Sequence, residues 1–206
     1  MMASRRIVSS LLLTAVLAGA GLPAAATVTD CDRLAGHKLD PDGVTAGISR
    51  AAMDREAAEK ACRAMVEAFP SHARSNYQLG RVLYYDGRAK ESLPYLRRAA
   101  DAGYPQAIFV LGFIQTIEDG VPDDVCAAAE LWQRSAALDH PWTAVFLVTG
   151  YLRGQFDACG LKLSDARIER LAALALSRVP YADSEGRVEV MLAALEAYRA
   201  GAGGDQ

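Results

Sequence analysis

The sequence predicts an all-α fold built as a solenoid, in which antiparallel helix pairs stack one after another. One phrase occurs twice, as YLRRAADAGYPQA at residues 95–107 and as WQRSAALDHPWTA at residues 132–144. The ends of the two copies, Ala107 and Ala144, lie 37 residues apart, a period typical of helical repeat arrays. No segment shows the two-residue alternation of apolar and polar side chains that marks a β-strand.

The N-terminal residues 1–26 have the layout of a cleavable signal peptide. Two arginines precede an apolar run from Ile7 to Leu17, and three alanines at 24–26 offer a small-residue cleavage site. The alternative is an uncleaved membrane anchor, although the apolar run is short for a span, which needs ~20 residues. We therefore expect a bacterial protein that is periplasmic or secreted, with no stable membrane insertion after cleavage.

The charge of the chain argues against a nucleic-acid partner. Without residues 1–26, which hold two arginines and no acidic residue, 20 basic residues stand against 25 acidic ones. No basic tract interrupts this mildly acidic composition, whereas nucleic-acid binding needs a concentrated basic face. The remaining 180 residues are enough for one domain with its own core. We expect a monomer that takes a protein or peptide partner.

Apolar positions at helical spacing place the elements in order along the chain. Residues 27–50 are rich in Asp, Gly and Pro and are predicted to be an irregular arm. A helical repeat domain at 51–200 and a disordered tail at 201–206 are expected to follow. The helices are expected at about 49–68, 72–85, 88–101, 105–117, 123–138, 141–152, 164–178 and 184–200.

Turn residues separate these helices. Pro70 ends the first helix, and the pairs Asp86-Gly87 and Ala102-Gly103 close the next two. Pro105 and Pro141 each stand in the first turn of a helix, where the missing N–H costs no helical hydrogen bond. The last helix has one apolar face and is predicted to cap the array, as solenoids require. The alternative is an exposed helix that binds a partner.

The repeated units resemble the Sel1-like repeat family, which is related to tetratricopeptide repeats. The shared features are Leu79-Gly80, Leu93, Leu96, Ala99, Ala100, Gly103, Leu111-Gly112, Asp119-Gly-Val121, Asp124, Ala128, Trp132, Ala136 and Ala137. The resemblance covers about residues 60–178 and implies a right-handed α-solenoid that acts as an adaptor or scaffold. Two positions depart from the family pattern: Thr149 replaces a glycine inside a helix, and His140 replaces a glycine after one.

An even number of cysteines in an exported chain suggests disulfides. The four are Cys31, Cys62, Cys126 and Cys159. Because each repeat of a solenoid touches only its neighbours, Cys31 cannot easily reach the last two. The predicted pairs are therefore Cys31–Cys62 and Cys126–Cys159, and the alternative is that some cysteines are free, buried thiols. No Cys/His spacing is typical of a metal or redox site.

The register of the units also predicts a binding groove. By analogy with tetratricopeptide arrays, the first helix of each unit lines the concave face. The inward positions are Arg74, Tyr77, Arg81 and Tyr84, then Gln106, Phe109 and Phe113, then Thr143, Phe146 and Arg153. Arginines and aromatic residues dominate binding hot spots, and an arginine can hold a carboxylate with two hydrogen bonds. The candidate binding residues are Arg74, Tyr77, Arg81, Tyr84, Phe113 and Arg153, and the alternative for the phenylalanines is core packing.

No residue pattern indicates catalysis. His37, His72 and His140 belong to different units, and we expect structural roles for them. There is no phosphate loop and no dinucleotide motif. We expect no catalytic residue, no cofactor and no metal, and a function in protein–protein interaction, which includes an envelope signalling or stress regulator. The alternative from another class is an envelope hydrolase or a β-lactam-binding protein, which the resemblance to cysteine-bearing Sel1-like proteins implies.

Overall fold

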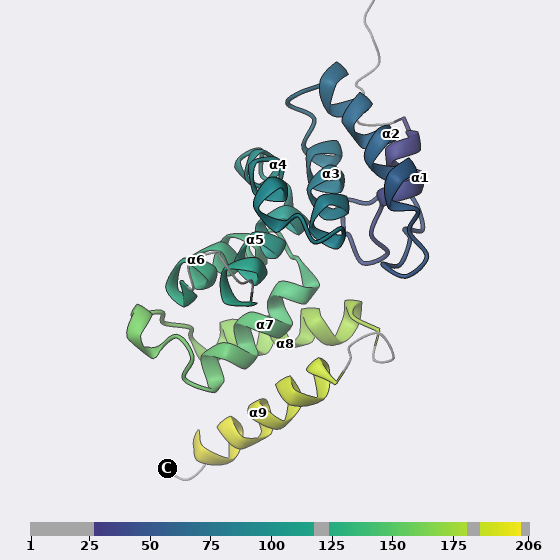
Figure 1. Ribbon diagram of the computed structural model, residues 1–206. Coiled ribbons are helices and arrows are strands. Elements are labelled where there is room, and N and C mark those ends of the chain that lie inside the picture. Colours follow the sequence, from purple (N-terminus) through teal and green to yellow (C-terminus); the bar gives the residue numbers. More distant parts are fainter. Residues whose placement is uncertain (1–26, 118–123, 181–185, 203–206) are drawn as a thin grey trace, which may run out of the picture.

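The computed structural model describes residues 27–117, 124–180 and 186–202, and every regular element in these ranges is helical (Figure 1). The elements are α1 (Asp30–Ala35), α2 (Arg55–Ala68), α3 (Ala73–Tyr85), α4 (Ala89–Asp101), α5 (Pro105–Ile117), α6 (Val125–Ala136), α7 (Pro141–Leu152), the short 3-10 helix η2 (Asp157–Cys159), α8 (Asp165–Arg178) and α9 (Arg187–Ala202). The prediction of an all-α fold is confirmed for these residues. The predicted signal peptide at 1–26 lies outside them.

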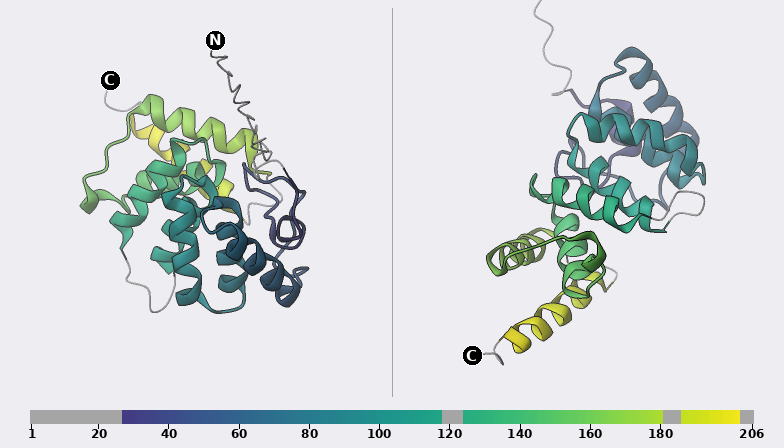
Figure 2. Two further views of the ribbon diagram at one scale, coloured as in Figure 1. Left: turned by 90° about the horizontal axis from the view of Figure 1, so that it is seen from above. Right: turned by 90° about the vertical axis from the view of Figure 1, so that its left-hand side faces the viewer.

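The helices stack in chain order, as expected for a solenoid. α3 packs on α4, α5 on α6 and α7 on α8, while contacts of α4 with α5 and of α6 with α7 join successive pairs. The stack runs from α1 and α2 at one end to α9 at the other (Figure 1), and the side view in Figure 2 shows the same order. α9 rests mainly on α7. The predicted stack of antiparallel helix pairs is therefore confirmed.

Glycines let the two helices of a pair approach closely. A Cβ atom on Gly80 would stand 2.7 Å from the side chain of Leu96, and one on Gly112 would stand 2.5 Å from the indole of Trp132. In the third unit we expected Thr149 to replace such a glycine, but the next residue, Gly150, takes the role. A Cβ atom there would stand 2.5 Å from the ring of Phe156, so this unit packs on the segment around η2.

The turn before α7 also differs from the prediction. We expected His140 to replace a glycine, but the residue with left-handed backbone is Asp139, at φ 55°, where the preceding turn has Gly103 at φ 82°. Aspartate tolerates this conformation better than most residues with a side chain. His140 instead caps the N-terminus of α7.

The N-terminal arm is more regular than predicted. It contains α1, because Thr29 and Asp32 form a capping box in which each side chain accepts a hydrogen bond from the backbone N–H of the other residue. The first long helix starts at Arg55, after the N-cap residue Asp54, and not near residue 49 as predicted. The polar spacing Thr-x-x-Asp is a signal for α1 that the prediction of an irregular arm missed.

The last helix boundary differs as well. α9 continues to Ala202, so it runs into the segment that was predicted to be a disordered tail. Residues 203–206 lie outside the described ranges. Among the described residues, no helix is both long and apolar enough to cross a bilayer.

Both predicted disulfides are present. Cys31–Cys62 joins α1 to α2, and Cys126–Cys159 joins the first turn of α6 to η2, with Cα–Cα distances of 4.7 and 5.2 Å. The first disulfide is fully buried, whereas both cysteines of the second are half-buried. Disulfides persist in oxidising compartments, which agrees with an extracellular or envelope location.

Candidate functional site

A hollow of about 470 Å³ opens between the arm and the first helices of the units. We name it the arm-side hollow. Its walls come from the arm, α3, α5, α7 and the start of α9. Four of the six predicted binding residues line it, namely Tyr77, Arg81, Tyr84 and Phe113. Residues that the predicted register assigns to the inner faces of α3 and α5 therefore line one shared space.

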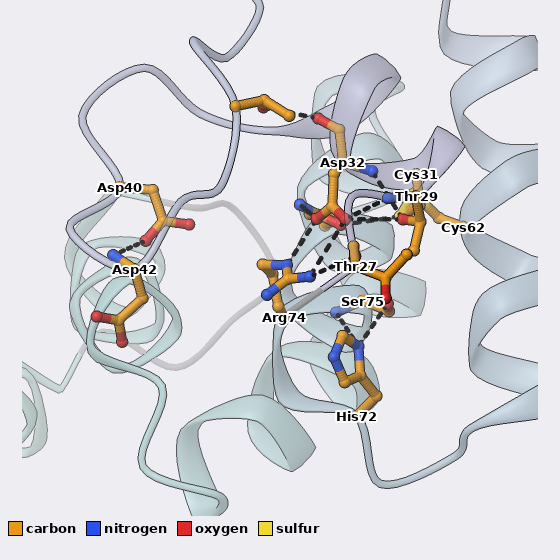
Figure 3. A network of polar contacts seen from close by, with 12 residues as sticks. Thr27, Thr29, Cys31, Asp32, Asp40, Asp42, Cys62, His72, Arg74 and Ser75 are labelled. Atoms are coloured by element: carbon orange, nitrogen blue, oxygen red, sulfur yellow. Dashed lines mark hydrogen bonds and ion pairs between the residues drawn. A yellow bond between two sulfur atoms is a disulfide. The ribbon is translucent and has the colours of Figure 1, made fainter. Parts of the chain in front are cut away.

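The arm crosses α3 and gives Arg74 an internal partner. Arg74 Nε donates to Asp32 Oδ1 at 2.6 Å, and Gln78 Nε2 donates to the same oxygen at 2.9 Å (Figure 3). Burial alone would raise the pKa of Asp32, but hydrogen bonds from Arg74, Thr29 and Gln78 hold this pKa below its usual value. Arg74 and Asp32 are both buried, so this pair fastens α1 to α3.

Arg81 holds the arm at two further points. Its guanidinium donates to the carbonyl oxygens of Ala35 and Gly36 at 2.9 and 2.8 Å, and to that of Ile48 at 2.6 Å. Arg81 is only 3% exposed. Arg74 therefore lies outside the lining of the hollow, unlike its predicted position, and Arg81 lines the hollow with its guanidinium already held by the arm. Oxygen atoms of the same chain take the acceptor positions that a partner was expected to fill.

A chain of buried polar groups links α3, α5, α6 and α7. His140 Nδ1 accepts from the backbone N–H of Thr143, so His140 Nε2 donates to Gln106 Oε1 at 2.8 Å. Gln106 in turn hydrogen-bonds Tyr77 on α3. Thr143 Oγ1 donates to Ser135 Oγ at 2.8 Å. These contacts give Tyr77, Gln106 and Thr143 roles inside the stack and fix the register of neighbouring units.

The arm also brings titratable groups into this interior. Tyr104 donates its hydroxyl to Asp40 Oδ2 at 2.7 Å, and burial raises the pKa of Asp40 to about 6. Burial and the charges of Arg81 and Lys38 lower the pKa of His37 to about 4. Burial lowers the pKa of His140 to about 3, with a smaller contribution from His37. Burial thus disfavours the charged form of the Asp40 carboxyl in the folded protein.

The histidines are closer together than their sequence positions suggested. His37 and His140 belong to the arm and to α7, yet they interact electrostatically. His72 and His140 are the N-cap residues of α3 and α7, which confirms structural roles for these two. His140 performs its role in the interior and not at the surface, because it is fully buried.

The open part of the arm-side hollow is aromatic and cationic. Phe113 and Phe146 meet edge to face with their ring centroids 5.7 Å apart, and both are half-buried. Phe109 is 9% exposed, so core packing, the alternative, describes it better. Among the lining residues that the sequence missed are Trp142, Arg50 and Arg187. Arg50 lies 5.0 Å above the Tyr85 ring, in a loop whose path could not be predicted.

Arg153, the sixth predicted binding residue, lies outside the arm-side hollow. It lines a second hollow of about 880 Å³, together with Trp132, Thr149, Phe156 and Val190. We name this space the C-terminal hollow. Phe113, Phe146 and Arg187 line both hollows, so they form a shared wall. The sequence placed Arg153 and the α3 residues in one groove. In the structure they line two adjacent hollows.

The site residues favour binding through side-chain contacts. No described residue in the lining of either hollow is acidic, whereas each lining contains several arginine or lysine side chains. Within the described residues, no group of three His, Cys, Asp or Glu side chains is arranged to hold a metal ion. The arrangement can therefore receive apolar or aromatic groups and stabilise a negative charge beside them.

No protein-family model matches the chain, and no curated protein matches it. Several solved structures are similar to it, among them the following two. One is a protective antigen of uropathogenic Escherichia coli that displays an SLR fold, with 22% identity, a TM-score of 0.48, and coverage of 62% of this chain and 27% of that chain. The other is a Sel1 repeat protein from Oxalobacter formigenes, with 20% identity, a TM-score of 0.47, and coverage of 62% and 94%. Both belong to the repeat class that the sequence resembles.

Proposed function

We propose that the protein is an exported adaptor that binds an acidic segment of a protein partner in the arm-side hollow. The observation that carries this proposal is the composition of the lining, which joins half-buried aromatic rings to cations and contains no described acidic residue. Such a surface complements a segment that carries an apolar side chain next to a carboxylate. The mechanism is equilibrium binding, with no chemical step and no cofactor.

The aromatic residues supply the anchor positions. Tyr84, Trp142 and Phe146 are half-buried, so part of each ring remains in contact with solvent in the free protein. Large aromatic side chains lose little conformational entropy on binding and bury much apolar area, which is why they dominate interface energetics. Burial of these rings by a partner would supply most of the affinity.

Arg50 supplies the charge that selects an acidic partner. It lies at the edge of the arm-side hollow and is exposed, whereas Arg81 is occupied by the arm. Charges at the edge of an interface mainly accelerate association and select partners, and their effect weakens with salt. We therefore expect partner binding to weaken as ionic strength rises.

The compartment is part of the proposal. The layout of residues 1–26 and the two disulfides support the periplasm or the extracellular space. A role as an envelope signalling or stress regulator is one form that such an adaptor takes. The protein is proposed to act as a monomer.

Site-specific photocrosslinking in the native envelope tests the function. A photoreactive phenylalanine analogue at Tyr84 is expected to capture a defined partner, which mass spectrometry identifies. The matched control carries the same analogue at Phe69, which is 47% exposed and does not line the hollow. An Arg50→Glu variant of the Tyr84 probe is expected to lose the adduct.

Three results would contradict the proposal. Capture from Phe69 as strong as from Tyr84 would show that the hollow is not the binding surface. An adduct that persists in the Arg50→Glu protein would show that charge does not select the partner. Absence of any adduct at Tyr84, with the protein folded by circular dichroism, would also count against a partner at this surface.

A further inference from the structure

The C-terminal hollow has an aromatic floor in which the indole N–H already has a hydrogen-bond partner. The rings of Trp132 and Phe156 lie with their centroids 6.1 Å apart, and those of Trp132 and Phe146 lie 5.4 Å apart. Trp132 donates its indole N–H to the carbonyl oxygen of Phe109 at 3.2 Å, so the polar atom of this side chain is already satisfied. Trp132 and Phe156 are 4% and 2% exposed, so the floor offers to the hollow a small part of these two rings together with the half-buried ring of Phe146.

The same hollow also has cationic lining residues. Arg153 and Arg187 both line it and both are exposed. Arg187 lies 5.0 Å above the ring of Phe146, whereas Arg153 forms no ion pair with any described side chain. No described residue in this lining is acidic. Among the residues that the structure describes in this lining, two positive charges thus lie beside an aromatic floor and no negative charge accompanies them.

The position of Arg187 is not explained by helix stability. It is the first residue of α9, and a cation at a helix N-terminus is opposed by the helix dipole. Arg153 follows the C-terminus of α7, where the dipole favours a cation, and the contact with the Phe146 ring offsets part of the cost at Arg187. Both arginines remain exposed beside the same hollow, where an anionic ligand can contact them.

A buried hydroxyl adds a specific polar contact. Thr149 lines the hollow, and its Oγ1 atom is buried without a hydrogen-bond partner among the described residues. An unpaired buried hydroxyl is unfavourable, and a ligand oxygen in the hollow would relieve this cost. Thr149 lies in the last turn of α7, and Arg153 is the C-cap residue four positions later, so the two side chains stand near one another at this end of the helix.

We infer that the C-terminal hollow binds a small amphipathic carboxylate, whose acid group lies between Arg153 and Arg187 and whose apolar body lies on Trp132, Phe146 and Phe156. The volume of about 880 Å³ falls in the range of small-molecule sites, ~300–1,000 Å³. Two guanidinium groups hold a carboxylate with charge-assisted hydrogen bonds. This site adjoins the proposed partner surface through Phe146 and Arg187, which line both hollows, and differs from it in Arg153, Trp132 and Thr149, which line only the C-terminal hollow.

The two tryptophans of the chain make the site measurable. They are Trp132, in the floor of the C-terminal hollow, and Trp142, in the arm-side hollow. In a Trp142→Phe protein, the fluorescence of Trp132 is the only tryptophan signal. Titration with decanoate, kept below its micelle concentration, is expected to give a saturable change, and decanol, which has the same apolar body without the charge, is expected to bind at least tenfold more weakly.

Three variants separate the contribution of each group. Arg153→Gln is expected to weaken decanoate binding at least tenfold, and Thr149→Val to weaken it by a smaller factor. Arg170→Gln, an exposed arginine on α8 outside the lining, is the matched control and should leave the dissociation constant unchanged. Isothermal titration calorimetry on the unmodified protein provides a second readout that does not depend on fluorescence.

The inference is overturned by any of three outcomes. Decanol binding as tightly as decanoate would remove the role of the charge. An unchanged dissociation constant in Arg153→Gln would remove this arginine from the site. If neither fluorescence nor calorimetry detects decanoate binding, the hollow does not bind amphipathic carboxylates. None of these results affects the crosslinking experiment at Tyr84, so the failure of one proposal can be distinguished from the failure of the other.

Discussion

The two ends of the helical stack use arginine and aromatic side chains in opposite ways. At the N-terminal end, the arm crosses α3, and its Asp32 and backbone carbonyls satisfy Arg74 and Arg81 in the interior. At the C-terminal end, η2 and α9 border α7 but leave Arg153 and Arg187 exposed beside an aromatic floor. The flanking segment, and not the repeat itself, decides whether such a face serves stability or remains open for binding.

Removal of the buried carboxylate at the N-terminal end should have the largest effect. Asp32→Ala leaves the Arg74 guanidinium buried without its counter-charge, and breaking a buried ion pair in this way costs about 3–5 kcal/mol. Urea unfolding monitored by circular dichroism measures the loss. The control is Glu169→Ala, which removes the exposed pair with Arg199 and should cost far less, because solvent screens exposed charges. Equal losses in the two variants would contradict the comparison.

The two disulfides should differ in reactivity more than in the stability they provide. They close loops of similar length, with sequence separations of 31 and 33, so replacement of either pair by alanines should cost about 2–4 kcal/mol. Cys31–Cys62 is fully buried and Cys126–Cys159 is half-buried, so a thiol reductant should open the second one first. Alkylation of the native protein during mild reduction, followed by mass spectrometry, gives the order. Earlier alkylation of Cys31 would show that the arm opens more readily than the η2 segment.

Asp40 should make the arm sensitive to pH. Its pKa is raised to about 6, so its stabilising contribution is present below pH 3.8 and is lost as the pH rises through about 6. Asp40→Asn should therefore gain stability relative to the unmodified protein between pH 4 and 7, by about 1–3 kcal/mol. Thermal unfolding of both proteins across this range measures the difference. A constant difference at all pH values would show that Asp40 does not titrate as described.

The smallest effect on stability is expected at Arg153. The side chain is exposed and forms no ion pair with a described residue, so Arg153→Gln should change the free energy of unfolding by less than about 0.5 kcal/mol. Urea unfolding tests this beside Arg74→Gln, which removes the charge that holds Asp32. A large loss in Arg153→Gln would mean that the C-terminal arginine is structural, and the contrast between the two ends would disappear.

The features that depend on local periodicity could be predicted from the sequence. Helix positions from α3 to α8 and the pairing of Cys126 with Cys159 follow from repeat spacing and from contact between neighbouring units. The path of the arm could not be predicted from the sequence, because it depends on one buried carboxylate and a few carbonyl contacts that no periodic pattern encodes. For the same reason Arg74 was predicted as a binding residue. Arg187 was missed because the last helix was predicted to begin at residue 184, whereas α9 begins at Arg187.

The arm has a consequence for the length of any bound segment. Each helix pair of a solenoid normally adds its own stretch of inner surface, so the number of pairs sets how many residues of an extended chain can be read. Here the arm occupies part of the first pair's inner surface, where Arg81 donates to the carbonyl oxygen of Ile48, and leaves Tyr84 at the open end of α3. The accessible track is therefore shorter than the helix count suggests, and a short recognition motif fits this protein better than a long one.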